Sequence, residues 1–366
     1  MKRSDLKYLF FTIVFCLVTF PVNSIAGGGD RLLMKEVKLV LKTSRNFKGK
    51  NLSHLDLSNL DMSNCNLANS DLEKAVLTGA DFSGSDLTGA NLYKAKLNGT
   101  KFIDADLTKA NLEKTDLSNS NMQKANLTEA NMAKSSLEGA NLEGTRFRKA
   151  DMYRVNLSKA DMSRAILSGA NLEQAEVTGA QMDNVIMYSA VMDEAELIGV
   201  DMSNSVLAKS SMVEARMIGV NLQGSDIQKA DFTKVDMRGV NLDGSTAKDT
   251  KFEQADLSGA SLIGAVLTNS NLIEANLNGA DLKTAKMGKS DLSEAKLGGA
   301  VLEDADLNNA NLSGADLKGA NLRNTNLEYA DFKGVDLTGA DFSGANVDGM
   351  KNIEKALNSN KAKGLF

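Results

Sequence analysis

Hydrophobic residues recur along this chain with a period of five. In steps of five from Phe47 to Val347, 61 positions keep one unbroken register, and 60 of them are Leu, Met, Phe, Ile or Val. The exception is Ala247. We call these positions pentad centres. The residue two places before a centre is small, and the residue directly before it is mostly Asp or Asn, as in ADLNN at 305–309.

A period of five suits neither an ordinary helix nor an ordinary strand. Five helical steps leave each centre rotated by about 140° from the last. Five strand steps move each centre to the opposite face. A chain that turns a corner after every pentad removes the conflict, because every centre can then point to one interior. Gly, Asn and Asp are suited to such tight turns.

Glycine spacing indicates how many corners close one coil. From Gly79 in steps of 20, Gly occupies 12 of 14 positions, whereas the interleaved series from Gly89 has Gly at 3 of 14. Residues 20 apart are therefore equivalent, and four pentads make one coil. The repeat predicts a four-sided solenoid of about 15 coils.

The pentads ADLNN, ANLSG and ADLKG resemble those of the pentapeptide-repeat family, over about 300 residues. The resemblance implies an all-β fold, a right-handed quadrilateral parallel β-helix in which the centre and the small residue face inward. The four-fold coil also follows from the glycine spacing, whereas the handedness rests on the resemblance.

Residues 1–26 have the layout of a secretory signal peptide. Lys2, Arg3 and Lys7 precede an apolar run at 9–20, and small residues follow before Gly27. The run is too short to span a bilayer, although an uncleaved anchor is the alternative. We therefore expect a periplasmic or secreted protein, with no membrane span after the leader is removed.

The remaining chain divides into a repeat and two ends. We expect an N-terminal cap segment at 27–45, the β-helix at 46–349, and a C-terminal cap and tail at 350–366. Caps are needed because an open solenoid exposes unpaired backbone and apolar centres. Residues 30–42 fit either an amphipathic helix beginning at Asp30 or a strand. Residues 353–357 fit a short helix, followed by a loose tail.

Catalytic and metal-binding groups are scarce in the sequence. The single His is His54, and Cys65 is the one Cys outside the leader, so no internal disulfide can form. The carboxylates follow the spacing of the repeat, which predicts turn and surface roles. We expect no catalytic residues, no cofactor-binding residues, no metal site and no enzyme activity. Charges of both signs are interspersed, with a formal net charge of −5, which does not favour nucleic acid.

Aliphatic residues interrupt the Asp/Asn position on one side of the solenoid. Ile166, Ile186 and Val206 are 20 apart and should stack, with Tyr188 beside them. Ile198 and Ile218 form a second stacked pair on another face. An exposed apolar stripe of this kind would be a partner interface. Alternatively, these residues reflect only the preference of β-branched side chains for strand positions.

Basic residues also form a column with a spacing of 20. The column suits an anionic polymer or headgroup, or it is a solvated edge that neighbours such as Glu73 and Glu113 neutralise. Its members are Lys74, Lys94, Lys114, Lys134 and Arg154.

These observations favour an exported, non-enzymatic scaffold or protein-interaction solenoid that binds a partner through an outer face. Two alternatives come from the resemblance: a secreted effector that acts in a host, and a DNA mimic that binds a topoisomerase. The leader and the mixed charge disfavour the DNA mimic. The partner is an unidentified protein, and the pattern also allows a homodimer.

Overall fold

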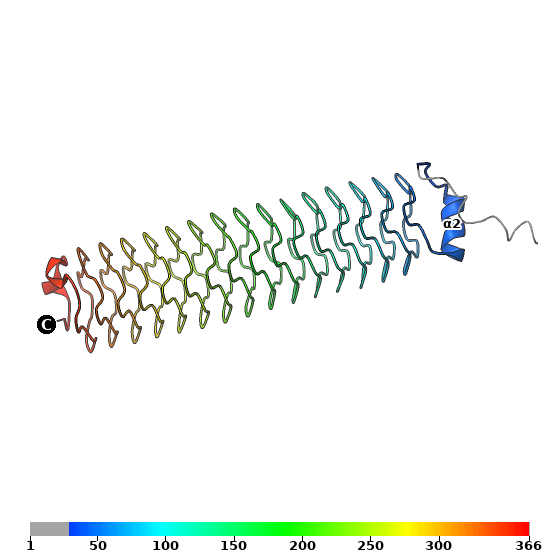
Figure 1. Cartoon of the computed structure of the whole chain (residues 1–366). Coiled ribbons are helices and arrows are strands. Elements are labelled where there is room, and N and C mark those ends of the chain that lie inside the picture. The colour runs from blue at the N-terminus through cyan, green and yellow to red at the C-terminus, as the bar shows by residue number, and fades with distance from the viewer. Residues whose placement is uncertain (1–28, 366) are drawn as a thin grey trace, which may run out of the picture.

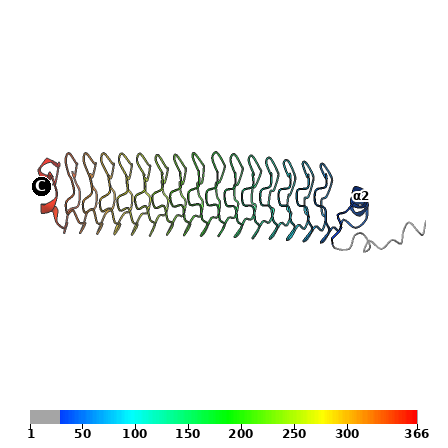
Figure 2. The same cartoon turned by 90° about the horizontal axis from the view of Figure 1, so that it is seen from above.

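The computed structural model describes residues 29–365, so the predicted signal peptide lies outside them. The chain is a right-handed quadrilateral β-helix, as the resemblance of its repeat implies. Its coils stack into one long, narrow tower with a helix at the N-terminal end and short helical turns at the other (Figures 1 and 2). The helices are α2 (Met34–Thr43), η2 (Ile353–Lys355) and η3 (Ser359–Lys361).

Strand pairing in the tower has a register of 20 residues. Each residue directly before a centre forms a parallel bridge with its equivalent one coil later, without interruption from Asn46–Asn66 to Asp331–Lys351. The pairs are single bridges, so no extended strand forms in residues 29–365. The register confirms that four pentads close one coil.

The pentad 305–309 shows why each position has its residue type. Asp306 and Leu307 donate their N–H groups to carbonyls of the coils on either side, at 2.9 and 2.8 Å, and Asn309 donates at 2.8 Å. Ala305 donates within its turn, at 3.0 Å. The N–H of Asn308 donates to Oδ1 of Asp306, at 3.1 Å. The Asp/Asn side chain thus accepts the one N–H that the backbone ladders leave over.

The core is a column of pentad centres lined by small residues. Every centre from Phe47 to Phe342 is fully or almost fully buried, and the Ala, Ser, Thr or Val positions facing it are also buried. Phe82 and Phe102 stack with ring centroids 5.2 Å apart. Ala247 stays buried and its coil keeps the register, so the missing large centre does not break the tower.

The corners require an unusual backbone conformation. The second turn residue has positive φ throughout the repeat, for example +66° at Gly279 and +61° at Lys289. Glycine adopts this region without the steric cost that other residues incur. A Cβ built on Gly279 meets no atom within 4 Å. Glycine is therefore favoured at this corner by its backbone conformation rather than by lack of space.

Both ends of the tower are covered. Helix α2 buries Val37 and Val40, and Oε2 of Glu36 accepts the N–H of Leu33 at 2.7 Å. The helical alternative for the N-terminal cap is therefore the one observed, but the helix begins at Met34 rather than at Asp30.

The C-terminal segment continues the coil rather than ending in a loose tail. Leu357 pairs with Asp336 and Lys363 with Asp341, because η2 and η3 each add one residue to a side of the coil. Leu365 is 8% exposed, so the expectation of a loose tail was wrong.

The inside–outside assignment predicts unequal costs for two truncations. Leu267→Ala removes a fully buried centre and should lower the free energy of unfolding by about 2–5 kcal/mol. Lys318→Ala removes only exposed ion pairs with Asp316 and Asp336, and should cost about 0.5 kcal/mol or less. Urea-unfolding curves measure both, and equal costs would contradict the assignment.

The corner conformation gives a second prediction. Gly279→Ala should destabilise the protein by about 1–2 kcal/mol, because alanine pays for positive φ. Lys289→Ala places the same residue at nearly the same φ, but lysine already bears that cost. The Lys289 variant should therefore lie within about 0.5 kcal/mol of the parent in the same urea titration. A Gly279 variant as stable as the parent would refute the explanation.

Candidate functional site

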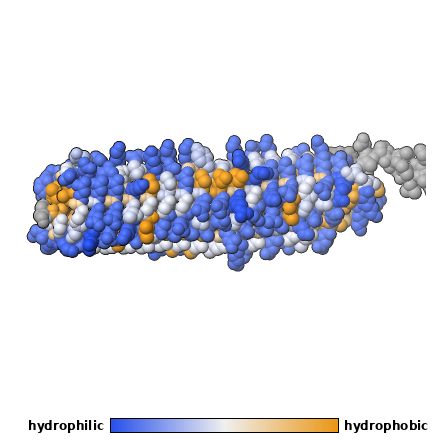
Figure 3. Space-filling view, turned by 90° about the horizontal axis from the view of Figure 1, so that it is seen from below, coloured by the Kyte–Doolittle hydropathy of each residue, from blue (hydrophilic) through white to orange (hydrophobic). Residues whose placement is uncertain are grey.

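Three aliphatic side chains stand on the outer surface near the middle of the tower. Ile166, Ile186 and Val206, which we call the aliphatic stripe, are joined by the parallel bridges Ile166–Ile186 and Ile186–Val206. Ile186 is 40% exposed, and the other two are half-buried. On the side that Figure 3 shows, hydrophobic surface is confined to small patches in a largely hydrophilic background. The structure therefore brings the predicted stripe together, one coil apart.

An aromatic side chain extends the stripe at its edge. Tyr188 follows Ile186 by two residues and is 42% exposed. The Lys209 ammonium lies 5.1 Å from the centre of the Tyr188 ring, and its hydrogen bond to the hydroxyl lowers the pKa of Tyr188. Ala208 occupies the equivalent position one coil later. The combination of an exposed ring and aliphatic groups is typical of contact surfaces.

One residue of each charge flanks the stripe along the tower axis. Arg146 forms a β-bridge with Ile166 on the N-terminal side, and Asp226 forms a β-bridge with Val206 on the C-terminal side. Arg146 is exposed. Neither residue stands out in the sequence, although both belong to the same series in steps of 20 as Ile186.

The aliphatic residues cost the tower local hydrogen bonds. Elsewhere the Asp or Asn before a centre accepts the N–H two residues later, as Asp226 Oδ1 does from Gln228 at 3.1 Å. Ile166, Ile186 and Val206 have no such acceptor. Each omitted bond forgoes about 0.5–1.5 kcal/mol, although the turn N–H groups remain at the surface. The stripe coils thus omit side-chain hydrogen bonds that other coils have, and the preference of β-branched residues for strand positions is the local effect that opposes this cost.

The second aliphatic pair lies elsewhere on the tower. Ile198 and Ile218 occupy the first turn position of successive coils, where Gly199 donates its N–H to the carbonyl of Ile218 at 2.9 Å. Both are half-buried. Their corner does not border the side that carries the stripe, so the structure does not join the two sets into one surface.

The basic column follows one corner, at the positive-φ turn position. Lys74 and Lys114 pair with Glu73 and Glu113, with Nζ–Oε1 distances of 2.8 and 2.7 Å. These hydrogen bonds lower the pKa of both carboxyl groups.

The other members of the column have different surroundings. The Lys94 ammonium lies 5.1 Å from the centre of the Tyr93 ring, and Nε of Arg154 donates to Gln174 at 2.6 Å. Lys134 is also exposed on this corner. The positive charge of the column is therefore partly neutralised by adjacent carboxylates, which favours the solvated-edge interpretation.

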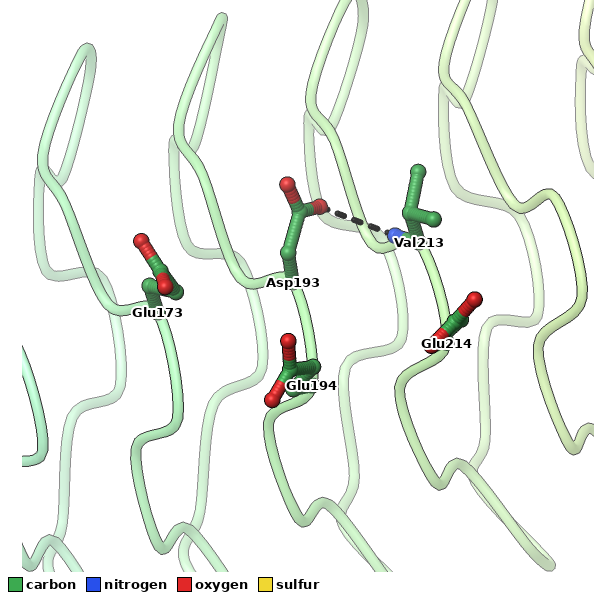
Figure 4. A pocket seen from close by; sticks show the side chains of 5 residues that line it. All are labelled: Glu173, Asp193, Glu194, Val213 and Glu214. Atoms are coloured by element: carbon green, nitrogen blue, oxygen red, sulfur yellow. Dashed lines mark hydrogen bonds between the residues drawn. The ribbon is translucent and has the colours of Figure 1, made fainter.

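The same corner becomes acidic further along the chain. Glu173, Asp193, Glu194 and Glu214 surround a shallow hollow with Val213 (Figure 4). Asp193 Oδ1 is already used, because it accepts the N–H of Val213 at 2.9 Å and the hydroxyl of Ser211 at 2.5 Å. Across residues 29–365, no group of three or more His, Cys, Asp or Glu side chains is arranged to hold a metal ion.

His54 and Cys65 occupy ordinary positions of the repeat. His54 sits at a positive-φ turn position, with φ of +59°. Cys65 is buried in a small-residue position, and burial raises the pKa of its thiol.

No helix within residues 29–365 has the length and apolar character needed to cross a bilayer.

Comparison with known proteins identifies the repeat. The family model described as pentapeptide repeats (8 copies) matches consecutive and overlapping segments from residue 46 to residue 349. A comparison with curated proteins gives no match.

Several solved structures are similar to this chain. HetL, a pentapeptide repeat protein involved in heterocyst differentiation regulation from the cyanobacterium Nostoc, is 25% identical, with 89% of this chain and 97% of HetL aligned and a TM-score of 0.20. QnrB1, a plasmid-mediated fluoroquinolone resistance protein, is 20% identical, over 60% of this chain and 90% of QnrB1, with a TM-score of 0.29.

A third structure has a higher sequence identity over a shorter length. Rfr23 from the cyanobacterium Cyanothece 51142 is 33% identical, over 28% of this chain and 63% of Rfr23, with a TM-score of 0.13. The family match covers most of the chain and coincides with the 20-residue bridge register. The chain belongs to the pentapeptide-repeat family.

Proposed function

We propose that this protein is an exported, non-enzymatic solenoid that binds a protein partner through the aliphatic stripe. The observation that carries the proposal is the outward stacking of Ile166, Ile186 and Val206 beside the exposed ring of Tyr188. These positions hold Asp or Asn in most coils, and the replacement costs turn hydrogen bonds without filling the core. A benefit outside the coil is the simplest physical reason for it.

The chemistry of the stripe suits a protein surface. Aliphatic groups and an aromatic ring gain free energy when water is removed from them by another apolar surface. A polyanion would need uncompensated positive charge, which the partly neutralised basic column does not offer. Pentapeptide-repeat proteins are generally non-enzymatic, and the placement of His54 in a turn and of Cys65 in a buried small-residue position agrees with that role.

Export rests on the leader at residues 1–26. An effector that acts in a host would use the same stripe and differ in where the protein is delivered. The DNA-mimic alternative has less support, because lysines and arginines alternate with carboxylates on the outer faces, as in the ion pairs Arg216–Glu196 and Lys251–Asp231.

Photo-crosslinking tests the stripe. A benzophenone amino acid in place of Tyr188 should give one discrete covalent adduct in intact cells, because the ring is exposed beside Ile186. Adding Ile186→Asp and Val206→Asp should abolish the adduct, since two charges oppose burial of the surface.

The matched control places the same probe at Tyr329, which is 49% exposed in a coil far from the stripe. It should not give that adduct. Equal adducts at both positions, or an adduct that survives the two Asp substitutions, would refute the stripe as the contact surface.

Export is tested by the N-terminus of the recovered protein. We expect the periplasmic or secreted protein to begin at Gly27, with the leader removed. Mass spectrometry of the fractionated protein measures the N-terminus and the compartment together. Full-length protein confined to the cytoplasm would contradict export without bearing on the stripe.

A further inference from the structure

The aliphatic stripe and its flanking charges are complementary to the same surface of a second molecule that runs antiparallel to the first. Along one outer column the tower presents, in successive coils, Arg146, Ile166, Ile186, Val206 and Asp226. We propose that two copies of this chain associate face to face and antiparallel through this column, with a two-fold axis at the coil of Ile186. The proposal rests on the proposed function, that the stripe is an interface, and specifies its partner.

The antiparallel arrangement pairs every member of the column with a suitable group. Ile186 meets its own copy, and Ile166 meets Val206 of the second copy. Arg146 of each copy then meets Asp226 of the other, which gives two equivalent ion pairs. An interface of this kind is isologous, with the same surface contributed by both subunits.

Beyond the stripe the column adds one further pair of opposite charges and no pair of like charges. In the same register, Asp86 lies opposite Lys286 of the second copy, and Asn126 lies opposite Thr246. Asp106 lies opposite Val266. From Asp86 to Lys286 the column therefore places no two like charges against each other. Complementary charges favour a particular register and suppress others.

Neighbouring registers are unfavourable. A shift of one coil in one direction places Ile166 against Asp226, and a shift in the other direction places Val206 against Arg146. Both would lose the two Arg146–Asp226 ion pairs and place a charge against an aliphatic side chain of the stripe, whereas the proposed register has such a contact only four coils from its centre, between Asp106 and Val266. The two charges that delimit the stripe thus select the register centred on Ile186.

The charged groups are available for these pairs. Arg146 and Lys286 are exposed, and neither has an ion pair within residues 29–365. Asp226 uses Oδ1 to accept two hydrogen bonds from Gln228, which leaves Oδ2 for an outside donor. The pairs would form without breaking a contact inside the tower.

The edges of the interface differ in character. At one edge the exposed Tyr188 rings of the two copies approach each other, which adds apolar contact. At the other edge Asp183 approaches its own copy. Hydrogen bonds from Ser163 Oγ and Asn184 Nδ2, at 2.6 and 2.7 Å, stabilise each Asp183 carboxylate and offset part of that repulsion.

The dimer should be weak. The stripe itself spans two inter-coil spacings, or about 10 Å along the axis. Stable interfaces bury about 800 Å² on each partner, more than three aliphatic residues and a ring supply. We therefore expect an equilibrium between monomer and dimer that depends on protein concentration.

A charge-reversal cycle on the processed protein tests the proposal by sedimentation equilibrium. Arg146→Glu alone or Asp226→Lys alone creates two repulsive pairs and should raise the dimer dissociation constant about tenfold or more. The double variant restores both attractive pairs and should dimerise like the parent. An equimolar mixture of the two single variants should form a heterodimer.

Dimerisation of the double variant, or of the mixed single variants, can be restored only by ion pairs between two molecules. Arg146 and Asp226 are four coils apart in one chain, or about 19 Å, so they cannot pair within a tower. Asp226→Asn keeps the acceptor for Gln228 and removes only the charge. It should weaken the dimer less than Asp226→Lys does, which separates charge from damage to the turn.

Lys96→Glu is the matched control, because Lys96 is exposed on another side of the tower. It should leave the dissociation constant unchanged. A parent protein that stays monomeric at all concentrations, or a dimer indifferent to the reversals at 146 and 226, would overturn the proposal. A monomer that still gives the Tyr188 crosslink to a different protein would overturn the homodimer alone and leave the proposed function standing.

Discussion

The 20-residue hydrogen-bond register is the constraint on which the whole molecule depends. Each pentad sends backbone N–H groups to the coil before it and the coil after it, and closes its corner with one further bond, as residues 305–309 show. The remaining N–H is taken by the side chain of Asp or Asn. Because most backbone N–H groups of the coil have this fixed destination, the interior can consist largely of Leu, Met, Phe, Ala and Val, with scattered Ser and Thr. Corners, core and caps all follow from keeping that register.

Much of this could be read from the sequence, because the same few contacts recur in every coil. The period of five located the buried centres, and the glycine spacing of 20 gave the number of sides. The corner conformation was less visible, since Lys74, Lys94 and many other residues hold the positive φ that glycine prefers. Stacking and hydrogen bonds between coils compensate for this local cost, and they are not apparent in a local pattern.

The ends and the outer surface were harder to predict. The last coil keeps its pairing although η2 and η3 lengthen two of its sides. The coil therefore continues after Val347, where the five-residue period of the sequence ends. The stacking of Ile166, Ile186 and Val206 was predictable from their spacing. The partial neutralisation of the basic column was not fully predictable, because it depends on side-chain rotamers at Lys74 and Lys114 that no spacing determines.

The core and the outer surface of this tower tolerate insertions and deletions of different lengths. An insertion or deletion of five residues keeps every centre inside, because each pentad is a complete side. The same change rotates all following outer residues by one side of the square, and would separate Asp226 from the column that carries Ile186. Only changes in units of twenty preserve both. The outer columns therefore repeat over a length four times that of the core pattern. An interface on one side of the tower restricts the insertions and deletions that preserve function to multiples of twenty residues.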